Sequence, residues 1–288
     1  MKVPRAFLFV PADSERKLAR GTESGADALI LDLEDSVGPE RKAIAREMAS
    51  AWLAGRGEAA PQAWVRVNAL DSGLVMADLA AVVRARPDGI VLPKCSGPDE
   101  LRRLDSALSA LEAREGLSDR SIRVMPIATE TPAALFTLGA YAGSPRLAAL
   151  TWGGEDLAAS VGAKANRLAD GTWDELFRLA RSLTLAGAAA AEVPAIDTVY
   201  ADFRNEAGFA AECADSRRMG FAGRMAIHPA QVPVILATFT PSAEEVAWAE
   251  AVVSAFAANP GAGVVSFEGR MLDRPHLLQA RRILDSRS

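Results

Sequence analysis

Two carboxylates, Glu130 and Asp156, each follow an apolar run of the kind that forms a buried strand. The runs cover residues 124–127 and 147–151, and a helical stretch is expected after each acid. The acids are 26 residues apart, roughly the length of one strand–helix–strand unit, so the two runs can be neighbours in a parallel sheet with strands about 4.8 Å apart. Both side chains would then project from adjacent strand ends, close enough to share one divalent cation.

Oxygen ligands that leave room for water and substrate suit Mg²⁺, or Mn²⁺, rather than zinc. The alternative interpretation is that Glu130 and Asp156 are helix N-cap acids that face solvent, a common place for carboxylates in loops. The spacing of the two acids does not decide between a metal site and two helix caps.

The composition excludes several classes of partner and location. Of the 288 residues, 50% are hydrophobic and 24% are charged, an ordinary globular balance that can fill a large core. The net charge is −5 without a basic block, which argues against nucleic acid and anionic membranes as partners. Cys95 and Cys213 lie far apart, outside any metal-binding spacing, as expected for a reducing cytoplasm. The start of the chain lacks the pattern of a signal peptide, and no run is long enough to span a membrane, so we expect a cytoplasmic protein.

Short apolar runs alternate with helical segments along most of the chain. The runs expected to be strands cover residues 6–10, 28–33, 63–68, 89–92, 124–127, 147–151, 195–200 and 224–227. Eight strands that alternate with helices predict parallel βαβ units closed into a (β/α)₈ TIM barrel, here over residues 1–240. An open doubly wound sheet is the competitor, but no Gly-x-Gly-x-x-Gly turn follows the first strand.

Residues 241–288 are expected to form a mainly helical C-terminal extension. One helix is predicted at about 242–258 and a last one at about 275–284, with a flexible segment marked by Gly261 and Gly263 between them. A barrel of eight strands needs no further element to close it. The extension is therefore expected to pack on a barrel mouth, either its own or that of a neighbouring subunit.

The working residues of such a barrel sit at the C-terminal ends of its strands. In this chain those ends carry Pro11, Asp32, Glu34, Asp35, Arg66, Asn68, Lys94, Glu130, Asp156, Asp202, His228 and Pro229. Arg66 is either an ion-pair partner of Asp32 or Glu34, or a planar two-point donor for a carboxylate or carbonyl. Lys94 could be a Schiff-base amine, although a structural lysine is favoured. His228 has no second histidine at a useful spacing, and neither a Ser-His-Asp nor a Cys-His arrangement can be assembled.

Several short motifs follow one another along the chain in a specific order. They are residues 8–11 (LFVP), 31–37 (LDLEDSV), 65–70 (VRVNAL), 92–94 (LPK), 130–132 (ETP), 153–157 (GGEDL), 195–200 (AIDTVY) and 227–229 (IHP). With these motifs the sequence resembles, nearly end to end, the citrate lyase beta-subunit-like family of Mg²⁺-dependent acyl-CoA lyases and related synthases, which are (β/α)₈ barrels.

The resemblance assigns roles to the residues at the strand ends. It implies that Glu130 and Asp156 hold Mg²⁺ and that Arg66 contacts the oxo or carboxylate oxygens of the substrate. It further implies that Glu34 and Asp35, within residues 32–35, support Arg66 and the waters on the metal.

The resemblance also concerns the CoA thioester and the extension. It implies that the thioester binds over the barrel mouth, with Lys17, His228 and Pro229 as contacts. It further implies that Asp273 enters the site of a neighbouring subunit in a ring-like homo-oligomer such as a trimer.

The function implied is cleavage of a 3-hydroxyacyl-CoA, such as malyl-CoA or citramalyl-CoA, to acetyl-CoA and a 2-oxo acid, or the reverse condensation. One alternative is a citrate lyase beta subunit that acts on a citryl thioester of an acyl carrier protein within a complex. Residues 65–72 and 205–209 resemble that subfamily, whereas His228 and Pro229 resemble the stand-alone CoA enzymes. The other alternative is a non-catalytic acyl-CoA-binding protein, against which the intact set of acids, Arg66 and Asp273 argues.

Overall fold

The computed structural model describes residues 3–267 and 269–286, which fall into two compact units. Pro4–Leu236 forms the larger unit, and residues 237–286 together with Val3 form the smaller one. Each unit has its own hydrophobic core, so we describe each by itself. Within the described residues, no helix is both long and apolar enough to cross a membrane.

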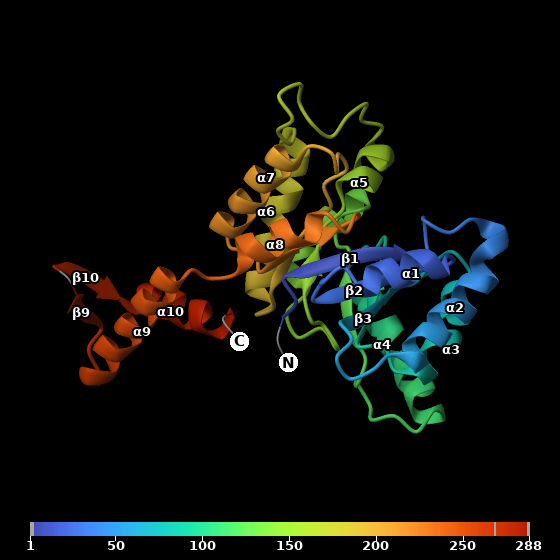
Figure 1. The fold of residues 1–288 in the computed structure, drawn as a ribbon, viewed down its shortest axis with the longest axis horizontal. Helices are drawn as coiled ribbons and strands as arrows, with labels where there is room; N and C mark the ends of the chain where they lie inside the picture. The colour runs from blue at the N-terminus through green and yellow to red at the C-terminus, as the bar shows by residue number, and fades with distance from the viewer. Residues whose placement is uncertain (1–2, 268, 287–288) are drawn as a thin grey trace. The chain divides into compact units, whose positions relative to one another are not determined.

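The larger unit is built on one eight-stranded sheet with helices outside it (Figure 1). Its strands are β1 (Ala6–Pro11), β2 (Ala28–Asp32), β3 (Gln62–Arg66), β4 (Gly89–Leu92), β5 (Arg123–Pro126), β6 (Leu150–Thr151), β7 (Ala195–Asp197) and β8 (Gly223–Ala226). They pair in parallel in the order β5-β4-β3-β2-β1-β8-β7-β6. Parallel bridges between Val124 and Leu147, and between Ile127 and Thr151, join the two ends of that order. The predicted (β/α)₈ barrel is therefore confirmed.

Apolar side chains from every part of the sheet fill the inside of the barrel. All residues of β2 are buried, as expected for a strand covered on both faces. Phe7, Trp64 and Met225 belong to one buried cluster, and the rings of Phe7 and Trp64 meet edge to face at 5.9 Å. This packing leaves only the strand ends free to carry polar groups toward solvent.

Helices and 3₁₀-turns connect the strands. They are α1 (Glu15–Thr22), η1 (Pro39–Arg41), α2 (Lys42–Gly55), α3 (Val75–Val82), η2 (Val83–Ala85), α4 (Pro98–Arg114), η3 (Pro132–Phe136), η4 (Leu138–Ala140), α5 (Gly154–Val161), α6 (Glu175–Ala190), α7 (Glu206–Met219) and α8 (Gln231–Phe239).

The elements around the two acids differ from the sequence-based expectation. The segment after Glu130 forms the 3₁₀-turns η3 and η4 rather than an α-helix, because Thr137 and Gly139 are weak helix formers and the Thr137 hydroxyl donates to Ser96 O at 2.8 Å. Strand β6 is only two residues long and α5 begins at Gly154. Asp156 consequently lies in the first turn of a helix rather than at the end of a strand.

The smaller unit contains a β-hairpin between two helices, which is more than the helical extension predicted. Helix α9 (Ala243–Ala258) begins with a capping box made by Ser242 and Glu245. Strands β9 (Val264–Phe267) and β10 (Arg270–Asp273) pair antiparallel, and α10 (Arg274–Ser286) follows directly. Val252, Phe256, Val265, Leu272 and Ala280 form its core. Its packing on a barrel mouth remains a prediction.

Candidate active site

A cavity of about 340 Å³ opens at the C-terminal end of the barrel. It is lined by residues of β1, β2, β3 and β8 and by residues that follow β2, β5, β6, β7 and β8. The volume lies within the usual range of small-molecule sites, and this end of a barrel is where active sites are found. Glu130, Asp156 and Arg66, which come from three different βα units, all line this one cavity.

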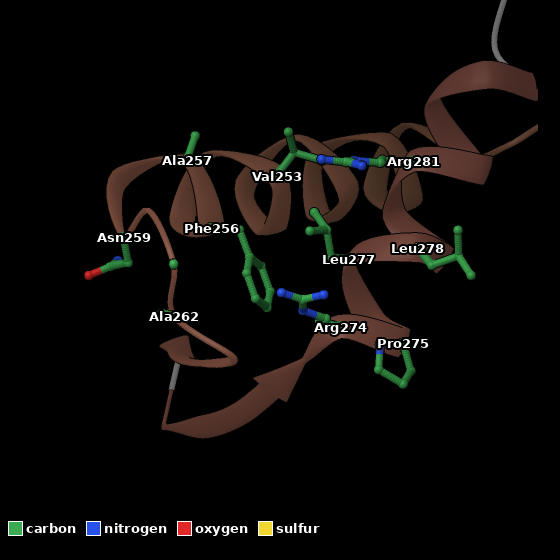
Figure 2. A pocket seen from close by; sticks show the side chains of 11 residues that line it. Val253, Phe256, Ala257, Asn259, Ala262, Arg274, Pro275, Leu277, Leu278 and Arg281 are labelled. Atoms are coloured by element: carbon green, nitrogen blue, oxygen red, sulfur yellow. The ribbon is translucent and has the colours of Figure 1, made fainter.

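A larger groove of about 720 Å³ lies in the smaller unit between α9 and α10 (Figure 2). Apolar side chains such as Phe256 and Leu277 line most of it, and Arg274 and Arg281 are its charged groups. None of its lining residues is an acid, a thiol or a histidine. The groove therefore lacks the groups for acid–base or metal chemistry, and the barrel cavity is the candidate site.

Arg66 is fixed at the cavity by a two-point bond to Asp32. Its Nε lies 2.7 Å from Asp32 Oδ1 and its Nη2 lies 2.7 Å from Asp32 Oδ2. Burial would raise the pKa of the Asp32 carboxyl, but the hydrogen bonds and charge of Arg66 outweigh it and lower that pKa. The ion pair with Asp32 is observed, while the role of Arg66 as a donor to a substrate remains a prediction. Its Nη1 hydrogens and its second Nη2 hydrogen do not bond Asp32 and are available for that role.

Glu34 lies beside Arg66 with one oxygen incompletely satisfied. Its Oε2 is 3.1 Å from Arg66 Nη1 but is buried without a hydrogen-bond partner. Burial raises the pKa of Glu34, and the opposing charges of Arg66 and Lys94 do not cancel that effect. A buried acceptor without a donor is costly, so this oxygen is suited to accept a hydrogen bond from a water or a ligand.

Lys94 joins the acids on both sides of the cavity. Its Nζ lies 2.5 Å from Glu34 Oε1, 3.4 Å from Asp35 Oδ2 and 3.5 Å from Asp156 Oδ1. Burial alone would lower the pKa of Lys94, but the bond to Glu34 and the neighbouring acids raise it. A protonated amine is not a nucleophile, so the geometry favours the structural role over a Schiff base.

The backbone of Lys94 also serves the site. Its φ is 52°, in the left-handed region that non-glycine residues seldom adopt. In this conformation its N–H donates to Glu130 Oε2 at 2.5 Å. Such strained residues gather at functional sites, and sequence reasoning did not find this contact because it depends on a backbone torsion.

Glu130 is deeply buried at the cavity, with 3% of its surface exposed. Burial raises its pKa to about 8 despite the N–H of Lys94, and the charges of Asp156 and Glu34 act in the same direction. Gly153 makes room for this side chain, since a Cβ at that position would lie 2.8 Å from Glu130 Cγ.

Neither acid is a helix N-cap, which removes the alternative role. Gly153 is the N-cap of α5, and Asp156 is the third residue of that helix. Thr131, not Glu130, caps η3. The side chain of Asp156 is 32% exposed, so one acid of the pair is buried and the other meets the cavity opening.

The donor set fits a hard divalent cation such as Mg²⁺ or Mn²⁺ better than zinc. Over residues 3–267 and 269–286, no group of three or more His, Cys, Asp or Glu side chains is arranged to hold a metal ion. The oxygens available are those of Glu130 and Asp156, with Glu34 linked to Asp156 through Lys94. Mg²⁺ is commonly bound by one or two carboxylates, with water and substrate oxygens completing its octahedron. Mg²⁺ therefore fits this pair.

The residues expected to contact CoA lie outside the lining of the cavity. Lys17 is exposed in the first turn of α1. The His228 ring stacks on Phe203 with centroids 4.7 Å apart, and its Nδ1 accepts the Ala230 N–H at 3.2 Å. Pro229 is half-buried beside it, and Ile227 is the lining residue of that segment. These expected CoA contacts thus follow β1 and β8 in the chain, and none of them lines the cavity that Glu130 and Asp156 line.

Asp273 belongs to the smaller unit, where β10 meets α10. Its side chain is 52% exposed, and its Oδ1 lies 2.6 Å from Nδ1 of His276. The bond to His276 lowers the pKa of this carboxyl. Its approach to the acids of a barrel remains a prediction.

Sequence reasoning missed Trp152 and Asp197 as parts of the site. Trp152 lines the cavity, and its Nε1 donates to Asp197 Oδ1 at 2.6 Å. The only signal in the sequence was the position of Trp152 directly before the Gly153–Gly154 pair, because a bond between side chains 45 residues apart depends on the packing of two strands.

Residues 5–229 match the family described as HpcH/HpaI aldolase/citrate lyase. The mitochondrial citramalyl-CoA lyase of Rattus norvegicus is 34% identical over 293 residues, which cover 97% of this chain and 85% of that protein. Citrate lyase subunit beta of Escherichia coli (strain K12) is 36% identical over 283 residues, which cover 97% and 92% of the two proteins. The solved structure of the protein CitE from Mycobacterium tuberculosis, in complex with magnesium, acetoacetate and coenzyme A, matches with a TM-score of 0.76 at 29% identity, and covers 98% of this chain and 97% of that chain.

Proposed function

Because the chain belongs to the HpcH/HpaI aldolase/citrate lyase family, we propose that it is a Mg²⁺-dependent lyase of a 3-hydroxyacyl-CoA. The substrate would be of the malyl-CoA or citramalyl-CoA type, and the products acetyl-CoA and a 2-oxo acid, with condensation as the reverse reaction. Relatives named as lyases support a carbon–carbon lyase rather than a non-catalytic acyl-CoA-binding protein. The observation that carries the proposal is one cavity lined by a carboxylate pair, Glu130 and Asp156, and by Arg66.

Glu130 and Asp156 are the residues that would hold the cation. The cation, when bound, lowers the pKa of the substrate's hydroxyl and offsets negative charge on its oxygen as the carbon–carbon bond breaks. The buried position of Glu130 supports this role, because burial makes its charge unfavourable unless a cation is near. The related CitE structure that contains magnesium and coenzyme A supports both ligands.

Arg66 would bind the end of the substrate that becomes the 2-oxo acid. Asp32 holds its guanidinium in one orientation, so the remaining N–H groups of Nη1 and Nη2 are already aimed when the substrate arrives. Planar donors of this kind match a carboxylate or a developing oxo group. Glu34 would accept from a water or a substrate hydroxyl at its unsatisfied Oε2, while Asp35 and Lys94 keep that acid in place.

Asp273 would move the proton at the methyl carbon of the acetyl group. In cleavage the departing carbon must be protonated, and in condensation it must lose a proton. We assign this half-exposed carboxyl, at the junction of β10 and α10, to the site of a neighbouring subunit in a homo-oligomer such as a trimer. Lys17, His228 and Pro229 would contact the CoA portion, which is too large for a cavity of about 340 Å³.

The second candidate is a citrate lyase beta subunit that acts on a citryl thioester of an acyl carrier protein. The observation that favours it is the 36% identity to the E. coli subunit of that name. The two candidates share the cavity and differ in the carrier of the thioester. Comparing CoA thioesters with carrier-protein thioesters separates them.

The test is to incubate the purified chain and Mg²⁺ with a panel of 3-hydroxyacyl-CoAs and to measure acetyl-CoA and the 2-oxo acid together. We expect equal amounts of both products from one or more members of the panel, and no products when a chelator is present or when Glu130→Gln replaces the native chain. Cleavage of a citryl carrier protein alone would favour the second candidate. Product formation by Glu130→Gln in the chelator would contradict both.

A further inference from the structure

Trp152 connects the carboxylate pair to a buried anion on the next strand. It follows β6, is 1% exposed and lines the cavity. Its indole Nε1 lies 2.6 Å from Oδ1 of Asp197, the last residue of β7. A tryptophan that lies against a ligand cavity therefore has its single polar atom turned away from the cavity and fixed to a charged acceptor.

Asp197 is held rigidly by groups behind the barrel wall. Its Oδ2 accepts from Arg181 Nη2 at 2.8 Å and lies 2.5 Å from the Ser216 hydroxyl, and its Oδ1 accepts the Thr198 N–H at 2.9 Å. The side chain is completely buried, yet the charges of Arg224 and Arg181 overcome the cost of burial and lower its pKa. The acceptor for Trp152 is therefore a fixed, charged oxygen, which makes the stronger kind of hydrogen bond.

The segment that Trp152 anchors has few side chains of its own to fix it. Gly153 and Gly154 follow it and lead directly into the first turn of α5, where Asp156 lies. Gly153 must be small because Glu130 occupies the space beside it, so no side chain of the turn can fix it there. On the β5 side the Gly153 N–H donates to Thr129 Oγ1 at 3.1 Å. On the β7 side the bond from Trp152 to Asp197 is the matching restraint.

We infer that Trp152 and Asp197 are positioning residues for the carboxylate pair. Their hydrogen bond holds the turn between β6 and α5 so that Asp156 stands where it shares a cation with Glu130. This inference rests on the proposed function. Groups that hydrogen-bond directly to metal ligands commonly change metal affinity by about 10- to 100-fold when they are removed, so the lower end of that range is expected for a restraint that acts through the turn.

The chain offers a matched control in Trp173. Its ring packs edge to face on Trp152 at 4.9 Å and also lies close to Gly154. Its Nε1 donates to a different carboxylate, Glu212, at 3.3 Å. Trp173→Phe therefore removes an indole N–H and some packing next to the same turn but leaves the bond between Trp152 and Asp197 intact.

The experiment titrates Mn²⁺ into metal-free protein and follows the free ion by electron paramagnetic resonance, with a thermal unfolding curve for each variant. We expect Trp152→Phe to weaken Mn²⁺ binding by about tenfold or more. Trp173→Phe should bind Mn²⁺ as the native chain does, although both variants unfold at lower temperature. Ser216→Ala removes one hydrogen-bond donor to Asp197, from a residue that does not line the cavity. This variant should weaken Mn²⁺ binding to a smaller extent. It replaces Trp152→Phe as the test if Trp152→Phe does not fold.

Unchanged Mn²⁺ affinity in Trp152→Phe would overturn the inference. If Trp152→Phe does not fold, unchanged Mn²⁺ affinity in Ser216→Ala would overturn it. An equal loss in the two tryptophan variants would also overturn it, because general packing would then explain the effect. In either case the proposed function would still hold if the native chain binds Mn²⁺ and Glu130→Gln does not. If the native chain binds no Mn²⁺, or Glu130→Gln binds it equally well, the proposed metal site and the inference both fail.

Discussion

The two ends of the barrel use similar residues in different ways. At the N-terminal end Arg146 has a fully buried side chain that bonds Asp105, Glu112, Ser109 and the Ile122 carbonyl. At the C-terminal end Arg66 is held by Asp32 and touches Glu34, with N–H groups left over. Both arginines lie among acids, but of the two only Arg66 has N–H groups without a hydrogen-bond acceptor among the described residues.

The acids at the two ends show the same contrast. Glu112 accepts from Arg146 and from the N–H groups of Arg120 and Ile122, and although burial acts to raise its pKa, these bonds lower it. Glu34 and Glu130 have raised pKa values because burial outweighs the partners they have. The Arg146 network at the N-terminal end is therefore satisfied within the fold, whereas at the C-terminal end Glu34 Oε2 is buried without a hydrogen-bond partner in the part of the chain that the structure describes. This matches the division of (β/α)₈ barrels into a stability end and an active end.

The largest effect is expected from removing the charges of the carboxylate pair. Glu130→Gln and Asp156→Asn should each lower the rate of thioester cleavage by about a thousandfold or more, because the cation would supply several kcal/mol of transition-state stabilisation. Thermal unfolding of Glu130→Gln should change little, since burial raises the pKa of Glu130 to about 8 and the metal-free fold therefore holds this side chain in its neutral form near pH 7. Acetyl-CoA release and circular dichroism measure the two quantities. Full activity of either variant would remove the pair from the mechanism.

Asp273→Ala should be nearly inactive while leaving the barrel's stability unchanged. This result would mean that the smaller unit supplies a residue needed for activity. If the acid acts from a neighbouring subunit, co-expression of Asp273→Ala with Glu130→Ala should restore activity at a fraction of the native rate. Some sites would then pair an intact carboxylate pair with an intact Asp273. The measurement uses purified mixed oligomers carrying two different tags, with each single variant as the control. Mixed oligomers without activity would mean that Asp273 works within its own chain or has no role.

The two arginines should respond differently to lysine. Arg66→Lys should lower kcat by about a hundredfold, because an ammonium keeps the charge but not the planar two-point donor. Arg146→Lys should leave kcat unchanged and lower the free energy of unfolding by about 3 kcal/mol or more, because it leaves buried acceptors unpaired. Steady-state kinetics and chemical denaturation of both variants provide the comparison. A small change in KM alone for Arg66→Lys would reduce Arg66 to a structural ion pair.

The last prediction concerns the pH dependence of the metal-free fold. Glu130 binds its proton up to a pKa of about 8 in the fold but only to about 4.5 in the unfolded chain, so the folded state holds more protons between these values. Stability should therefore fall as pH rises from about 4.5 to 8, by at most about 1.4 kcal/mol per pH unit from this group. Denaturation at several pH values in a chelator should show a steeper decline for the native chain than for Glu130→Gln. Parallel declines would show that Glu130 is ionised in the fold.

Much of the barrel was predictable from the sequence because its pattern is local. Runs such as 28–32 and 89–92 are apolar on both faces, which only a strand covered on both sides requires, and glycine, proline and capping residues such as Ser14 mark where helices begin. The alternation of such runs with helices leads to a parallel barrel, and a barrel gathers its strand ends. The placement of Arg66 and Glu130 in one cavity follows from that rule, whereas Asp156 reaches the same cavity from the first turn of α5.

Other features depended on contacts between distant residues, which only the tertiary structure could decide. The left-handed backbone of Lys94 and its N–H bond to Glu130 join residues 36 apart, and the bond from Trp152 to Asp197 spans two strands. The helix that carries Asp156 begins at Gly154, and Glu130 fills the space that a side chain at Gly153 would need. In each case the sequence supplied suitable side chains, but torsion angles and packing across strands determined which of them meet.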